Sequence, residues 1–221
     1  MGELGDRHHA VLTCDVVGSR DVPDRQALQD ALRRLLADLN DTFAGIIRVP
    51  FSISVGDEFQ GVAAPDGRLV RLIDTMQRTL HPVRVRVGVG IGAVSTDFAS
   101  RSQEMDGPAF LFAREALDLA KAQTPQAWLC FRTADEAFDL AANGIALLLG
   151  LVKERWKPLH WSRAALRDQG LNAEEIARRE GVTQAAVSFA LSSSGYLTVR
   201  QAESNLAGLI DSWWVHKSTD L

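Results

Sequence analysis

The 221-residue sequence lacks the features that mark secreted, membrane-spanning and metal-stapled proteins. It holds only two cysteines, Cys14 and Cys130, without C-x-x-C spacing, which argues against a disulfide scaffold or a structural zinc site and is typical of a reducing compartment. Its longest apolar run, residues 145–152, is far shorter than the roughly 20 residues of a membrane-spanning helix. The opening MGELGDRHH has no apolar signal-peptide core. We therefore expect a cytoplasmic protein that does not enter a membrane.

A strong charge of either sign is also missing, since the formal net charge is −4. The stretch from Leu151 onward carries +1 and the rest of the chain −5, so neither part is strongly basic. This balance gives no support to nucleic-acid binding by the chain as a whole, because affinity for a phosphate backbone comes largely from Lys and Arg.

Hydrophobic patterning predicts an alternation of strands and helices. Apolar or alternating runs predict strands near 9–17, 49–55, 59–63, 83–94 and 127–131, and helical spacing predicts helices near 24–39, 69–80 and 108–122. The order β-α-β-β-α-β-α-β is typical of an α/β sandwich with its helices on one face of the sheet. After Asn143-Gly144 the pattern is wholly helical, so we predict an α/β domain at 1–142 and a helical domain at 143–221.

The clearest strand, VRVRVGVGIGAV at residues 83–94, has valines on one face and Gly88, Gly90 and Gly92 on the other. The spacing G-x-G-x-G inside a strand is not the dinucleotide-binding fingerprint, which opens a helix. Three missing side chains on one face predict that a helix, another backbone or a ligand comes close there.

Two acidic positions are notable because apolar sequence surrounds them. Asp57, followed by Glu58, lies at the tip of a predicted hairpin in FSISVGDEFQGVA, where turn chemistry alone can account for it. Asp15 ends an apolar strand, where a solvated turn residue is not expected. If that strand lies beside the hairpin, Asp15 and Asp57 converge at one end of the sheet and need a partner. A magnesium ion, which binds a few carboxylates together with substrate phosphates, is such a partner.

Three motifs carry a resemblance to known families. VLTCDVVGSR (11–20) resembles the first-strand signature of class III nucleotide cyclases. VGDEFQG (55–61) resembles their Gly-Asp hairpin and the GGDEF hairpin of diguanylate cyclases, and VGVGIG (87–92) resembles the strand that follows. Together with the helical segment below, the chain resembles the SatD family, which is inferred to join a cyclase-like palm, a ferredoxin-like sandwich, to a DNA-binding helix-turn-helix.

This resemblance implies a site for Mg²⁺ or Mn²⁺ and a nucleoside triphosphate. The implied metal ligands are Asp15, Asp57 and Glu58. The implied nucleotide-binding residues are Val16, Val17, Gly18, Ser19, Gly56 and Arg114.

The sequence lacks several residues that act directly in catalysis by the cyclases. Leu111 stands in place of the ribose-orienting Asn and Glu115 in place of the charge-stabilising Arg, with Arg114 one position early. The base-selecting Lys before the Gly-Asp is absent as well. Phosphoryl transfer depends on such positioning and cationic groups. We therefore expect a metal-nucleotide site with weak or no turnover, and an active nucleotidyl cyclase acting on ATP or GTP is the alternative.

The segment LNAEEIARREGVTQAAVSFALSSSG (171–195) predicts a helix-turn-helix, with Gly181 at the turn, Thr183 capping the second helix, and Ile176, Val182, Val187 and Leu191 in its core. A plain helical hairpin that packs against the palm or a partner is the alternative. The predicted DNA-facing residues are Arg178 and Arg179 for phosphates and Thr183, Gln184, Ala185, Ser188 and Phe189 on the second helix.

These motifs favour a DNA-binding regulator whose palm senses a nucleotide. A partner-binding or DNA-binding module whose palm is only a scaffold is a further hypothesis. A single helix-turn-helix of modest charge contacts few phosphates, so we expect a homodimer. The amphipathic segment Val199 to Trp214 can serve either self-association or docking on the palm.

Overall fold

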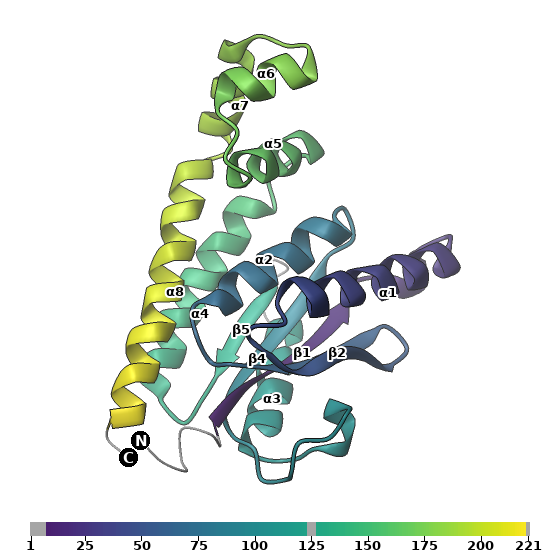
Figure 1. The fold of residues 1–221 in the computed structure, drawn as a ribbon, viewed down its shortest axis with the longest axis vertical. Coiled ribbons are helices and arrows are strands. Elements are labelled where there is room, and N and C mark those ends of the chain that lie inside the picture. The colour runs from purple at the N-terminus through teal and green to yellow at the C-terminus, as the bar shows by residue number, and fades with distance from the viewer. Residues whose placement is uncertain (1–7, 123–126, 220–221) are drawn as a thin grey trace.

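The computed structural model describes residues 8–122 and 127–219 (Figure 1). Its centre is a five-stranded sheet of order β2-β3-β1-β4-β5, antiparallel except for the β4–β5 pair. The strands are β1 (His8–Val16), β2 (Ile47–Val55), β3 (Glu58–Ala63), β4 (Val85–Ala93) and β5 (Leu129–Arg132). The helices between them are α1 (Arg25–Thr42), α2 (Arg68–Leu80) and α3 (Pro108–Ala122). The predicted element order and the mixed α/β palm fold are confirmed.

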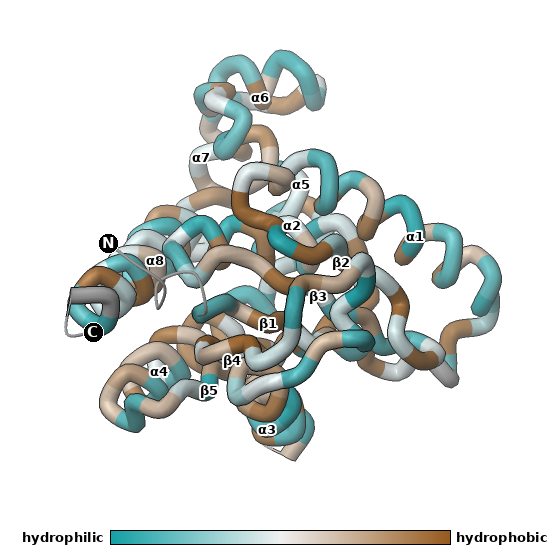
Figure 2. The backbone as a smooth tube through the Cα atoms, turned by 60° about the horizontal axis from the view of Figure 1, so that its bottom comes forward, coloured by the Kyte–Doolittle hydropathy of each residue, from teal (hydrophilic) through white to brown (hydrophobic). Residues whose placement is uncertain are grey.

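Helices cover both faces of the sheet, so the prediction that they share one face was wrong. On one face, Leu12 of β1 and the valines of β4 pack in a single core with the apolar sides of α1 and α2. On the other face, α3 lies directly on β4 (Figure 2). The glycines of β4 explain the difference, because a Cβ at Gly88 or Gly90 would lie within 3.0 Å of α3 backbone atoms. Of the alternatives for this glycine face, a helix is the one that comes close.

The C-terminal part consists of α4 (Glu136–Lys153), α5 (Pro158–Asp168), α6 (Ala173–Glu180), α7 (Gln184–Ser193) and α8 (Tyr196–Thr219). The predicted boundary at 142/143 falls inside α4, which packs beside β5. Helix α8 runs back along α4 and α2, and its Leu206 and Ile210 are buried in the main core, so this helix docks on the palm. Helices α5 to α7 project beyond the sheet (Figure 1). None of the helices that the structure describes has the length and apolar composition to cross a bilayer.

An asparagine closes each edge of the sheet. Asn40 of α1 accepts a hydrogen bond from the Phe51 amide of β2 (2.8 Å) and donates one to the Phe51 carbonyl oxygen (3.1 Å). At the opposite edge, Asn143 of α4 makes the same two bonds to Phe131 of β5 (2.7 and 3.0 Å). Each side-chain amide thereby takes the place of one residue of a neighbouring strand.

A buried ion cluster joins the palm to the C-terminal helices. Lys153 of α4, only 4% exposed, lies 2.6 Å from an Asp74 oxygen of α2 and also contacts Glu203 of α8. Burial raises the pKa of Asp74, but Lys153 and two arginines beside it outweigh burial and hold that pKa below its ordinary value. Burial raises the pKa of Glu203. The other members of the cluster are Arg78, Asp168 and Arg200.

Both thiols are predicted to be unreactive in the folded protein. Burial raises the pKa of Cys130 to about 11, and burial with Glu58 and Asp15 nearby raises that of Cys14 well above its usual range. At pH 8 roughly one thousandth of the Cys130 thiol is therefore thiolate, the reactive form, and the raised pKa of Cys14 likewise keeps that thiol protonated. An aromatic disulfide reagent should modify neither cysteine natively and both in guanidinium. Fast reaction of the native protein would show instead that the sheet opens.

Candidate functional site

The strand register places the predicted acidic residues at one end of the sheet. Asp15, near the end of β1, pairs with Glu58 of β3 on one side and with Arg86 of β4 on the other. The first strand therefore lies beside the hairpin, as predicted, and the direct neighbour of Asp15 is Glu58. Sequence reasoning missed Arg86, although its position two residues before Gly88 puts it on the same face of β4 as the glycines.

Two cations from α3 reach these acids. Arg114 holds Glu58 with two hydrogen bonds, of 2.9 and 2.6 Å, and this contact raises the pKa of the arginine. Lys121, two turns further along α3, lies 3.3 Å from an Asp15 oxygen and 3.9 Å from a Glu58 oxygen. Arg86 adds a third cation, 3.6 Å from Asp15. Because the β4 glycines let α3 lie so close to the sheet, both α3 side chains are within reach of the acids.

Asp57 lies in the β2–β3 turn, next to Glu58 in the chain. Gly56 beside it has a φ of +64°, which explains the glycine at the turn tip. The Asp57 carboxylate accepts a short hydrogen bond from the Ser19 hydroxyl. Further residues that the resemblance assigns to a nucleotide are engaged within the chain as well, since the Val17 amide donates to the Arg84 carbonyl oxygen (2.8 Å) and the Val16 side chain is buried in the core. Gly18, also of positive φ, leads into the short helix η1 (Ser19–Asp21).

This arrangement does not fit a divalent cation. Asp15 and Glu58 are neutralised by side chains of the same chain, and a metal would have to displace them. Among the residues described, no group of three His, Cys, Asp or Glu side chains is placed to hold a metal ion. The assignment of Asp15, Asp57 and Glu58 as magnesium ligands therefore stays a prediction from the resemblance.

The predicted helix-turn-helix corresponds to α6 and α7. Gly181 ends α6 in the left-handed conformation, with a φ of +67°, where a side chain would be strained. The Thr183 hydroxyl accepts a hydrogen bond from the Ala186 amide (3.2 Å) and caps α7. Ile176 and Val187 are fully buried between the two helices. The expectation that Val182 fills this core was wrong, because its side chain is 41% exposed.

A third helix, α5, completes the unit. Its Leu166 packs with Ile176 and Val187, and its Arg163, 4% exposed, ion-pairs with Glu180 and donates to the Ala186 carbonyl oxygen (3.1 Å). Sequence reasoning did not single out this helix. The signal that could have found it is Pro158, a helix-starting residue, followed by apolar residues at helical spacing.

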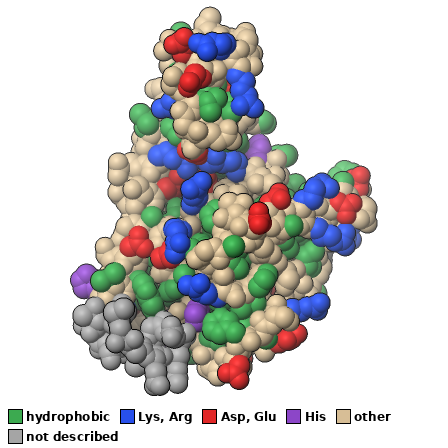
Figure 3. Space-filling model, in the orientation of Figure 1, with side chains coloured by type: hydrophobic (Ala, Val, Ile, Leu, Met, Phe, Trp, Pro, Cys, Tyr) green, Lys and Arg blue, Asp and Glu red, His purple; other side chains and the backbone are tan. Residues whose placement is uncertain are grey.

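The residues predicted to face DNA share one property, which is that all are exposed at the projecting end. Arg178 is ion-paired with Glu174 on the same helix (3.0 Å). On the visible face of this end, acidic and basic side chains are mixed (Figure 3). The exposed set is Arg178, Arg179, Thr183, Gln184, Ala185, Ser188 and Phe189.

Comparison with known proteins places the chain in a family. A solved bacterial light-regulated adenylyl cyclase is 17% identical, with a TM-score of 0.40, covering 57% of this chain and 75% of that one. A microbial GGDEF domain, solved in a study of cyclic di-GMP, is 18% identical, with a TM-score of 0.35 and coverage of 52% and 74%. A regulator of polyketide synthase expression from Bifidobacterium adolescentis is 14% identical, with a TM-score of 0.27 and coverage of 92% and 86%. No curated protein matches. A model of the SatD family matches residues 9–207, so the chain belongs to the SatD family.

Proposed function

We propose that this protein is a DNA-binding regulator that reads sequence through α7 and uses its cyclase-like palm as a regulatory domain without turnover. The observation that carries the proposal is the α5–α7 unit. It has the glycine turn, the capped second helix and the three-helix core of a helix-turn-helix, and it projects clear of the sheet (Figure 1).

The exposed face of α7 has side chains suited to base recognition. Gln184 and Ser188 lie four residues apart and therefore on the same face, where an amide and a hydroxyl can reach base edges in the major groove. Phe189, 74% exposed, is a large apolar side chain that water solvates poorly and that can contact a thymine methyl group. A plain helical hairpin packed against the palm would bury this face, and here the face is open.

Loss of the Gln184 amide is expected to weaken specific binding. A preferred duplex would first be selected from random sequences and its affinity measured by fluorescence anisotropy. Gln184→Ala should lower that affinity about ten-fold or more while leaving binding to unrelated DNA unchanged, because one good base contact contributes about 1–3 kcal/mol. Gln201→Ala, an exposed glutamine on α8, is the matched control and should have no effect. Selection of no sequence by the wild-type protein would contradict the proposal.

Arg179 is expected to act differently, as a phosphate contact. It lies at the end of α6 and makes no ion pair with another described residue. Arg179→Ala should weaken specific and non-specific binding alike and reduce the salt dependence of log K by about one unit. The same titrations, repeated across salt concentrations, measure this slope. An unchanged slope would remove Arg179 from the interface.

The palm is proposed to be catalytically silent because its acids are already paired. Calorimetric titration of Mg²⁺ with ATP or GTP should give no heat with the wild-type protein, and incubation with Mg²⁺ or Mn²⁺ should release no pyrophosphate. Binding that disappears in Asp15→Asn would restore the metal-nucleotide hypothesis, and pyrophosphate release would establish the cyclase alternative. The predicted homodimer remains a prediction, which sedimentation velocity can test.

A further inference from the structure

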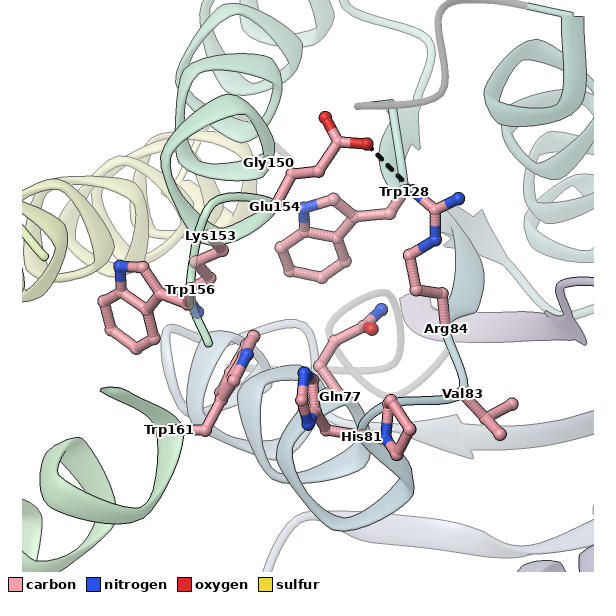
Figure 4. Close-up of a pocket in the computed structure, with 11 residues that line it drawn as sticks. Gln77, His81, Val83, Arg84, Trp128, Gly150, Lys153, Glu154, Trp156 and Trp161 are labelled. Atoms are coloured by element: carbon pink, nitrogen blue, oxygen red, sulfur yellow. Dashed lines mark hydrogen bonds and ion pairs between the residues drawn. The ribbon is translucent and has the colours of Figure 1, made fainter. Parts of the chain in front are cut away.

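A cavity of about 250 Å³ lies where the palm meets the helix-turn-helix (Figure 4). Its lower wall comes from the end of α2, with His81, and its side from the start of β4, with Arg84. Trp128 lies just before β5. Its ring is across the open space from the His81 ring and from the ring of Trp161, which belongs to α5. Elements of the α/β part and of the projecting part therefore line one cavity.

Four of the eleven residues that line this cavity carry flat rings. The His81 and Trp161 rings are 5.4 Å apart, and Trp156 packs edge-on against Trp161 at 5.0 Å. Lys153, held by the buried ion cluster, lies 5.6 Å from the centre of the Trp128 ring and 5.7 Å from that of Trp161. Rings of this kind favour a planar guest, which can stack on one face while its edge meets another ring.

The indole N–H groups of the two tryptophans beside the cavity differ in their hydrogen bonding. Trp156 donates its indole N–H to the Ser194 carbonyl oxygen (2.7 Å). The N–H of its neighbour Trp161 is buried and has no acceptor among the described residues. This N–H is closed to water, so it lies behind the cavity wall and not against a guest. At the rim, Arg84 and Glu154 form an ion pair of 3.1 Å, which can supply polar contacts to a guest.

The size of the cavity limits the guest. Pockets for drug-sized ligands span about 300–1,000 Å³, so 250 Å³ suits a single small ring system and not a triphosphate. We propose that this cavity is a binding site for a small planar heteroaromatic molecule of nucleobase size that presents hydrogen-bonding groups to the charged rim. Binding of a guest in this cavity does not involve Asp15, Glu58 or the cations paired with them at the end of the sheet.

Because the cavity lies between the palm and α5, a ligand bound there can affect how α5 to α7 are oriented. The chain between α4 and α5 passes Glu154 and Trp156, and both line the cavity. A guest held between Trp128 on the palm side and Trp161 on α5 fixes the angle at which α5 to α7 leave the palm. Ligand binding itself is independent of DNA binding, and only this regulatory consequence rests on the proposed function.

The test uses the 221-residue protein labelled with 5-fluorotryptophan. Each of its five tryptophans then gives a separate fluorine NMR signal. The probe is adenine, and cyclohexanol is a non-planar control. We expect adenine, at up to about 5 mM, to shift the Trp128 and Trp161 signals and to leave Trp213 and Trp214 unchanged. Cyclohexanol should shift none.

A pair of variants completes the test. Trp128→Leu removes one flat wall at a half-buried position and should weaken base binding about ten-fold or more. Trp214→Leu, half-buried on α8 and outside the cavity, should leave it unchanged. Thermal melting checks that both variants fold. Absence of any shift, equal shifts with cyclohexanol, or shifts confined to Trp213 and Trp214 would each overturn the proposal, and none of these results depends on DNA binding.

Discussion

Gly90→Ala is expected to destabilise the protein severely. The new Cβ would lie within 3.0 Å of the Ala109 carbonyl oxygen and the Ala113 amide nitrogen, which belong to the α3 backbone. A helix backbone cannot rotate away as a side chain can, so α3 as a whole would have to move off the sheet. Overpacking costs about 1–3 kcal/mol where side chains can adjust, and we expect at least the upper end here. Denaturant unfolding monitored by circular dichroism measures the loss.

Gly92→Ala is the matched control, one glycine further along the same face of β4. Its Cβ would lie 3.3 Å from the Ala109 amide nitrogen and from the Phe112 ring, which a shift of a few tenths of an ångström relieves. We expect a change within about 1 kcal/mol. Similar small effects at both glycines would mean that α3 does not lie this close to β4. In that case the reach of Arg114 and Lys121 to the acids would also be in doubt.

Lys153→Met is expected to be the second most damaging change. The substitution keeps a similar volume but removes the buried ammonium that contacts both Glu203 and Asp74. Removing one partner of a buried ion pair costs about 3–5 kcal/mol, and we expect the lower end because Arg78 and Arg200 still face the acids. The free energy of unfolding, from urea titration at pH 7, is the measurement.

The double variant Lys153→Met with Glu203→Gln separates charge from packing. It removes one charge of each sign, so the remaining cluster is again balanced. We expect it to be more stable than Lys153→Met alone, by about 1–2 kcal/mol. If the second substitution destabilises further, the loss in the single variant came from packing, and the cluster does not act through its charge balance.

The architecture of the palm could be predicted because it rests on local patterns. Alternating hydrophobicity in β2 and β4 predicts the strands, and Gly56 predicts the hairpin turn. The three glycines of β4 predict that another element comes close to this strand. That the approaching element is α3 could not be read from these residues. It depends on which face each helix takes, and the prediction of a one-sided sandwich was wrong on this point.

Residues at the charged end of the sheet could be singled out from the sequence, but their contacts could not. The convergence of acids at the hairpin end follows from strand order, which the pattern gives. The pairing of Arg114 with Glu58 and of Lys121 with Asp15 depends on how α3 is rotated over the sheet, and no local pattern encodes that. The same holds for Lys153, which lies in an apolar helical run and meets acids 79 and 50 residues away.

The two asparagines at the sheet borders bear on how copies of the protein can meet. An outer strand with free amides and carbonyls is a template on which another chain can add a strand. Here the outward groups of Phe51 and Phe131 are already satisfied by Asn40 and Asn143. Growth of one continuous sheet across two molecules is thus blocked at the middle of both outer strands. We therefore expect two copies of the protein to meet through surfaces other than these strand edges.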